Sequence, residues 1–250
     1  MTLPLFVVGE GALDGVLPGG GFVLDGDEGR HAATVRRIRG GERLDVADGN
    51  GRIARCLVAA AGRDRLDLVV EEVSDVVPRL PRLVLVQALA KGGRDEQAVE
   101  TATEFGVDAV VPWAADRSVV RWTGDRGERS RRRWEATATA AAKQSRRATV
   151  PAVEAATTTA GLAARAAAGE ALLVLHEEAA EPLSSVVLPS AGTSGVLLVA
   201  VGPEGGITSA EVERLLGAGG RAVRLGPEVL RASSAGAAAL AVLSVRLGRW

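Results

Sequence analysis

The 250-residue sequence contains one cysteine, Cys56, and only two lysines. A single cysteine cannot form an internal disulfide bond and does not supply a cluster of metal ligands. We therefore expect the chain to bind no metal. Cys56 lies within a predicted strand among apolar residues, so we expect it to pack in the interior. No run of roughly 18 apolar residues occurs, so no transmembrane helix and no membrane partner are predicted. The first five residues show no basic segment leading into an apolar run, so we expect no secretory signal and a cytoplasmic location.

Phosphate-binding loops are also missing, since neither a GxGxxG pattern nor a Walker P-loop occurs in the sequence. A nucleotide-dependent oxidoreductase or a kinase is therefore disfavoured. Hydrophobic residues make up 47% and charged residues 24% of the chain, as is usual for a globular protein.

The net charge is only −1, but the basic residues are clustered. Nine basic and three acidic residues lie between Arg121 and Arg147. A second cluster contains Arg30, Arg36, Arg37, Arg39 and Arg43. Each cluster is consistent either with a surface for a polyanion or with a solvated helix face. Trp122 and Trp134, which lie among the arginines, are candidates for stacking on RNA bases, whereas we expect Trp113 in the core.

Residues 1–75 are predicted to form a small β-barrel with one short helix. Apolar patterns typical of strands occur at 22–24, 43–47, 51–58 and 65–70, and a helical pattern at 27–38. The segment Asp48–Gly51 is a strong hairpin signal because its residues tolerate positive φ angles.

After Pro78 and Pro81 the pattern changes, and residues 80–250 are predicted to form an α/β domain. Strands are expected at 83–89, 109–113, 172–175, 196–201 and 222–225, and helices at 95–105, 127–145, 158–168, 209–216 and 233–247. This alternation predicts a parallel sheet that is covered on both faces.

Three loops at strand ends are candidates for a binding site. The strand 196–201 runs into Gly202–Gly206, followed by a helix that Thr208 or Ser209 can cap. Leu225–Arg231 is a similar loop, and His176 follows the strand 172–175. Glycines allow the backbone to approach a ligand closely, although a purely structural turn also explains them. Because parallel α/β sheets bind ligands at the carboxyl ends of their strands, the three loops together predict such a site.

These loops resemble the signature of the RsmE family, SPOUT-class methyltransferases that form 3-methyluridine in small-subunit (16S) ribosomal RNA. The resemblance rests on Gly202-Pro-Glu-Gly-Gly206 and on Leu225-Gly-Pro-x-x-Leu-Arg231. Further matches lie along the whole chain, at Arg30-His31, Val35-Arg36-Arg37, Gln87–Lys91, Thr103–Val107 and Lys143–Arg146.

The resemblance implies a PUA-like β-barrel amino domain and a SPOUT α/β-knot domain with a trefoil-knotted parallel sheet. It also implies a homodimer that binds S-adenosylmethionine in the knotted loops, and a 16S rRNA substrate, either free or within the assembled small subunit. Carried over, the candidate cofactor-binding residues are Leu175, His176, Val201, Gly202, Pro203, Glu204, Gly205, Gly206, Leu225, Gly226, Leu230 and Ser233. The candidate RNA-binding residues are Arg30, His31, Arg36, Arg37, Lys91, Arg146 and Arg147.

Arg231 is the candidate catalytic residue. Arginine is not a base near neutral pH, but a guanidinium beside the uridine ring nitrogen would stabilise its anion. A buried structural ion pair is the alternative role for Arg231, and Glu204 either contacts a ligand or caps the following helix.

The triplet Ala232-Ser233-Ser234 departs from the Thr-Glu-Thr or similar hydroxyl-rich triplet that is common in the family, so the first hydroxyl and the middle carboxylate are absent. Ser233 and Ser234 remain able to bond the cofactor or to cap the last helix. A non-catalytic RNA-binding protein therefore stays the alternative function.

Overall fold

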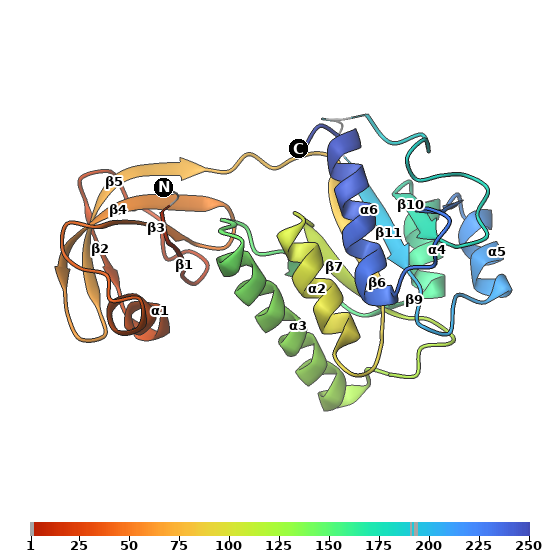
Figure 1. The fold of residues 1–250 in the computed structure, drawn as a ribbon, viewed down its shortest axis with the longest axis horizontal. Coiled ribbons are helices and arrows are strands. Elements are labelled where there is room, and N and C mark those ends of the chain that lie inside the picture. Colours follow the sequence, from red (N-terminus) through yellow and green to blue (C-terminus); the bar gives the residue numbers. More distant parts are fainter. Residues whose placement is uncertain (1–2, 191, 193–194) are drawn as a thin grey trace. The chain divides into compact units, whose positions relative to one another are not determined.

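The computed structural model describes residues 3–190, 192 and 195–250. The prediction that the chain has no secretory signal rests in part on residues outside this set. The chain divides into two compact units, and most of their elements are labelled in Figure 1. The first unit contains the residues up to Val77 together with Ala142–Val150, and the second contains Pro78–Ala141 and Pro151–Trp250.

The first unit is built on a five-stranded sheet in the order β1-β3-β4-β5-β2. Its strands are β1 (Leu5–Val7), β2 (Gly21–Leu24), β3 (Arg43–Ala47), β4 (Arg52–Ala61) and β5 (Leu66–Asp75). β1 pairs with β3 in parallel, and the other pairs are antiparallel. Cys56 is fully buried among the apolar side chains of this sheet, which confirms its predicted packing role.

The predicted helix 27–38 is shorter and less regular than expected. The helix α1 (Gly26–Arg30) continues as a π-helical segment, η1 (His31–Val35). The carboxyl end of the long helix α3 (Gly124–Gln144) belongs to this unit, because Lys143 Nζ lies 2.5 Å from Glu28 Oε1. A backbone hydrogen bond from Val150 N to Gly49 O (2.7 Å) joins the end of the segment Ala142–Val150 to the rest of this unit.

The second unit has the predicted parallel sheet, in the order β12-β10-β11-β6-β7-β8, with β9 also paired to β7. Its strands are β6 (Arg82–Ala88), β7 (Ala109–Ala114), β8 (Ala152–Val153), β9 (Thr157–Thr158), β10 (Ala171–Leu175), β11 (Val196–Val201) and β12 (Arg221–Val223). Its remaining helices are α2 (Arg94–Glu104), α4 (Thr159–Ala167), α5 (Ser209–Gly217) and α6 (Ala232–Arg246).

Helices cover both faces of this sheet, as predicted. Leu162 of α4 and Leu215 of α5 join a core with β6, β7, β10 and β11 on one face. On the other face α6 packs on β6, β11 and α2 (Figure 1). A Cβ atom on Gly236 would lie 2.8 Å from Leu85 Cδ1, so this glycine allows α6 to approach the sheet closely. Because α2, α5 and α6 follow the parallel strands β6, β11 and β12, all three helices begin at the edge of the sheet where these strands end.

In the part of the chain that the structure describes, no helix is long and apolar enough to cross a membrane. Over the same residues, no group of three or more histidine, cysteine, aspartate or glutamate side chains is arranged to hold a metal ion.

Candidate functional site

The loops that follow β10 and β12 are joined by backbone hydrogen bonds. The N–H of His176 donates to the oxygen of Val223 (2.9 Å), just beyond the paired ends of the two strands. Further along, Arg224 N donates to Glu181 O (2.9 Å), and Leu183 N donates to Arg224 O (2.8 Å). Since β10 lies between β11 and β12, the three predicted loops follow adjacent parallel strands at one edge of the sheet.

Packing fixes the shape of the loop after β11. A Cβ atom on Gly202 would lie only 2.6 Å from Ile207 Cγ1, and Gly206 has a φ angle of 75°, in the left-handed region. The oxygen of Gly205 accepts a hydrogen bond from Arg117 Nη1 (2.8 Å). The glycines at 202 and 206 thus have a structural requirement of their own, in addition to any role in ligand approach.

Thr208 caps α5, as predicted, and forms a capping box with Glu211. Glu211 is only 3% exposed, and its carboxylate accepts bonds from Thr159 Oγ1 (2.6 Å), Asp116 N (3.0 Å) and Thr208 N (3.1 Å). Burial acts to raise the pKa of Glu211, but these hydrogen bonds outweigh it and the net shift is downward. No role is predicted for Glu211 from the sequence, although the pattern Thr208-x-x-Glu211 is the usual signal for a capping box.

Glu204 forms an ion pair with Arg94, with 2.9 Å between its Oε1 and Nη1 of the arginine. The cap of α5 is made by Thr208, so the proposed helix-capping role of Glu204 is wrong. The ion pair instead ties the loop after β11 to the start of α2.

The loop after β12 presents unpaired backbone groups beside apolar side chains. Among the described residues, no hydrogen bond engages the backbone N–H groups of Leu225, Gly226 or Leu230. The side chain of Leu230 is 41% exposed next to them. Unpaired peptide groups of this kind are available to a ligand.

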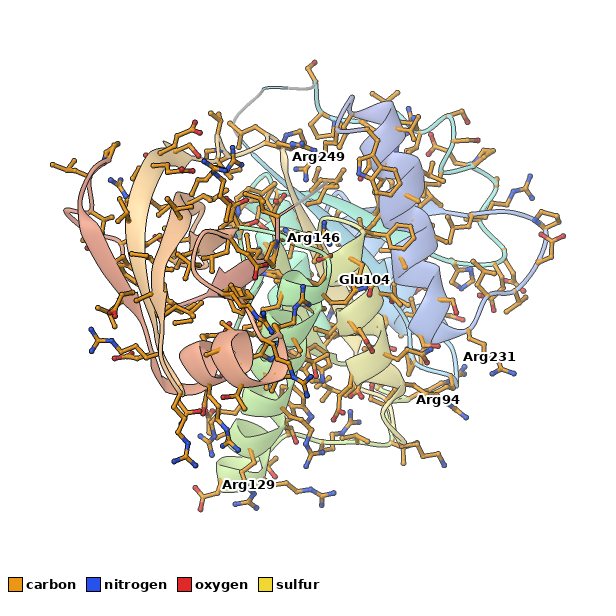
Figure 2. The ribbon with its side chains drawn as sticks, turned by 60° about the vertical axis from the view of Figure 1, so that its left-hand side comes forward. Arg94, Glu104, Arg129, Arg146, Arg231 and Arg249 are labelled. Atoms are coloured by element: carbon orange, nitrogen blue, oxygen red, sulfur yellow. The ribbon has the colours of Figure 1, made fainter. Side chains whose placement is uncertain are left out.

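Arg231 lies at the start of α6 with an exposed side chain, and Figure 2 shows it at that end of the helix. Its backbone oxygen accepts bonds from Ser234 N (2.9 Å) and Ala235 N (3.0 Å). The alternative role in a buried ion pair is therefore wrong. Arg231 itself is the N-cap residue and no side chain caps α6, so the suggested capping by Ser233 or Ser234 is wrong too. Ser233 is only 6% exposed.

Six of the candidate RNA-binding residues lie in the first unit, namely Arg30, His31, Arg36, Arg37, Arg146 and Arg147. The seventh, Lys91, lies in the second unit after β6. Arg37 and Arg146 have φ angles of 56° and 57°, a region that residues other than glycine rarely occupy. The ring of His31 makes an edge contact with Phe6, with 6.0 Å between the centroids.

Part of the two basic clusters is structural. Arg43 pairs with Glu71 (2.8 Å) and Arg131 with Glu135 (2.5 Å). The guanidinium of Arg121 donates to the backbone oxygens of Ala115 and Asp116. These side chains stabilise their own unit, so the surface left for a polyanion is smaller than the sequence predicts.

The tryptophans divide between core and surface. Trp113 is fully buried, as predicted, and its Nε1 donates to Thr159 Oγ1 (3.2 Å). Trp134 is only 1% exposed, so its predicted stacking on RNA is wrong. It packs edge-on against Trp122, with 5.0 Å between the ring centroids, and Trp122 is partly exposed.

Comparisons with known proteins identify the family. A family model described as an RNA methyltransferase domain matches residues 78–244, and one described as an RNA methyltransferase PUA domain matches residues 24–71. Ribosomal RNA small subunit methyltransferase E of Mycobacterium tuberculosis is 50% identical over 91% of this chain and 87% of its own length. The Bacillus subtilis protein of the same name is 32% identical over 89% of each chain.

A solved structure has the same fold over nearly the whole chain. Ribosomal RNA small subunit methyltransferase E from Neisseria gonorrhoeae, bound to S-adenosyl methionine, superposes with a TM-score of 0.84 and 26% identity over 98% of both chains. The predicted fold class, a PUA-like domain followed by a SPOUT methyltransferase domain, is confirmed. The chain belongs to the ribosomal RNA small subunit methyltransferase E family.

Proposed function

We propose that this protein transfers the methyl group of S-adenosylmethionine to N3 of a uridine in 16S rRNA. The observation that carries the proposal is the convergence of three loops at the carboxyl ends of β10, β11 and β12, in a chain of this family. The position N3 and the uridine come from the motif resemblance at Gly202–Gly206 and Leu225–Arg231.

The loop residues fit the cofactor. We assign its binding to Leu175 and His176, to the segment Val201–Gly206, and to Leu225, Gly226, Leu230 and Ser233. Unpaired backbone N–H groups in the loop after β12 suit an adenine ring and a carboxylate, while the partly exposed Leu230 offers apolar contact. When bound, the cofactor supplies a methyl group made electrophilic by the sulfonium.

The protein's contribution is to position the uridine and to stabilise the charge that develops on it. The ring nitrogen carries a proton at neutral pH and becomes nucleophilic only as that proton leaves. The exposed guanidinium of Arg231 supplies a fixed positive charge at the start of α6, and the amino end of this helix adds to the same field. Both favour the uridine anion, and Arg231 does so without acting as a base.

RNA binding is assigned to the first unit together with Lys91. The family model described as an RNA methyltransferase PUA domain matches residues 24–71 of this unit. The exposed side chains of Arg36, Arg37 and Arg146 provide positive charge for phosphate contacts. Because ribosomal RNA is the proposed substrate, we infer a cytoplasmic location. Free 16S rRNA and the assembled small subunit are to be compared directly as substrates.

We also propose the homodimer and the trefoil knot that the resemblance implies. Val245 and Trp250 are 64% and 61% exposed at the end of the chain, and the ring of Trp250 contacts that of Phe105 at a tilt of 41°, with 5.6 Å between the centroids. Such apolar surface is typical of an interface between subunits. Light scattering after size exclusion gives twice the mass of one chain if the dimer forms.

The decisive experiment combines cofactor binding with product analysis. We expect calorimetry to show saturable binding of S-adenosylmethionine and none of ATP, and mass spectrometry to find 3-methyluridine in treated 16S rRNA. Replacement of Gly205 by tryptophan, whose Cβ would lie 3.3 Å from Arg117 Cβ, should abolish cofactor binding. RNA binding without any cofactor binding would instead support the non-catalytic alternative.

A further inference from the structure

A pocket in the second unit lies outside the cofactor loops. It has a volume of about 450 Å³ and is formed by the segment after β6, the start of α2, the segment that leads into α3, and the amino-terminal half of α3. Its lining includes Lys91, Asp95, Trp122, Arg126, Arg129 and Trp134. The volume is in the range of pockets that hold small ligands.

The charge of this pocket is positive. Arg126 and Arg129 have no ion-pair partner within residues 3–190, 192 and 195–250, whereas Arg131 on the same helix has two. Figure 2 shows Arg129 at the amino-terminal end of α3. The lining carries four basic side chains (Lys91, Arg126, Arg129 and Arg133) against two carboxylates (Asp95 and Glu96), so its net charge is positive.

Asp95, which is 6% exposed, accepts bonds from the backbone N–H groups of Glu96 (2.9 Å) and Ala90 (3.4 Å). Glu96 pairs with Arg133 at 3.4 Å. The lining therefore leaves guanidinium groups free for an anion.

One wall of the pocket is aromatic. The ring of Trp122 is partly exposed and makes an edge-to-face contact with the buried ring of Trp134, at an interplanar angle of 75°. Gly92 and Gly93 also line the pocket, with φ angles of 71° and 75°, and added Cβ atoms there would meet nothing within 4 Å. An aromatic face next to free guanidinium groups is the arrangement that binds unpaired nucleotides.

The ion pair between Arg94 and Glu204 connects this pocket to the cofactor loops, because Arg94 directly follows Gly93 and Glu204 belongs to the loop after β11. The geometry points to this pocket as the site of an unpaired nucleotide of the RNA substrate. Its base stacks on Trp122, and its phosphates lie against Arg126 and Arg129. The inference rests on the proposed function, since it assumes that RNA is the substrate.

The charge component is tested with the full-length double variant R126Q/R129Q. Its matched control is R132Q/R214Q, which removes two exposed arginines that lie outside the pocket. Affinity for a single-stranded fragment of 16S rRNA is measured by fluorescence anisotropy across a range of salt concentrations. Loss of two phosphate contacts lowers the slope of log K against log salt by about 1.4, whereas the control slope changes little. Equal slopes in the two variants would overturn the assignment.

The aromatic component is tested with W122L and W122F. Loss of one stacked base weakens RNA affinity about tenfold in W122L, and W122F restores most of it. Calorimetry should give the same affinity for S-adenosylmethionine in all variants. If W122L fails to fold, the comparison of W122F and the charge variants still decides the question.

RNA affinity is measured without turnover, so this inference and the proposed function fail separately. If the wild-type protein makes no 3-methyluridine but the pocket variants bind RNA more weakly than the wild type does, only the proposed function is refuted. A wild-type protein that makes 3-methyluridine while the pocket variants match the control would refute only the pocket.

Discussion

Replacement of Glu211 by alanine should destabilise the second unit strongly. The carboxylate is buried and accepts hydrogen bonds from four donors, which are the backbone N–H groups of Asp116 and Thr208 and the hydroxyls of Thr159 and Thr208. The hydroxyls are able to rotate toward other acceptors, but the two N–H groups are fixed. Each buried donor without an acceptor costs about 1–3 kcal/mol, so we expect E211A to lose about 3 kcal/mol of unfolding free energy.

Urea unfolding followed by tryptophan fluorescence measures this loss in the right unit, because all four tryptophans lie in the second unit. The matched control is E213A, which removes an exposed carboxylate from the same helix. A change of at most about 0.5 kcal/mol is expected for this control. If E211A shifts the urea midpoint no more than E213A does, the reasoning about the buried carboxylate is wrong.

The same residue predicts a pH dependence with a definite sign. Burial acts to raise the pKa of Glu211, but the hydrogen bonds hold it below its ordinary value. The stabilisation is therefore complete above the unfolded pKa of about 4.3 and is lost as the pH falls through the lower pKa of the folded state. We expect wild type to lose more unfolding free energy than E211Q does when the pH falls below about 4. Parallel curves for the two proteins would contradict this account.

Three further outcomes are expected. R231Q should lower kcat for methyl transfer by about 10- to 100-fold and leave the Kd for S-adenosylmethionine unchanged, because a charge-assisted bond contributes about 1.5–3 kcal/mol; equal losses in both would remove Arg231 from catalysis. R37G and R146G should raise the thermal unfolding temperature, since glycine adopts the left-handed conformation without the steric cost of about 1 kcal/mol that arginine has there. Both variants should bind RNA more weakly in a filter assay, because each lacks a basic side chain. Burial raises the pKa of the Cys56 thiol to about 11, so a disulfide reagent at pH 8 should label it only in urea.

The elements of the second unit were predictable where apolar runs end at glycine. β11 has the expected bounds, Val196–Val201, because Gly195 precedes this run and Gly202 follows it. The strands β8 and β9 contain only two residues each, and such short segments show no periodicity. The capping box at Thr208 and Glu211 was visible in the sequence, but the burial of its carboxylate depends on Asp116 and Thr159, which are distant along the chain.

The wrong prediction for Trp134 has a geometric cause. Arginines at 131, 132 and 133 precede it in the sequence, but consecutive residues of a helix point in different directions. Trp134 therefore faces the interior while its immediate neighbours face solvent. Similarly, the ion pair of Arg43 with Glu71 joins residues of strands that are not adjacent in the sheet order, and no local pattern indicates it.

The membership of Ala142–Val150 in the first unit has a consequence for synthesis on the ribosome. The last residues that the first unit needs emerge 73 positions after Val77, because the segment ends at residue 150. At about 5–20 residues per second, translation reaches them roughly 4–15 s later. Until then Glu28 lacks Lys143 and Gly49 lacks its backbone partner Val150. The amino-terminal unit of a nascent chain therefore completes its own contacts only after the whole segment Pro78–Ala141 of the second unit has been made.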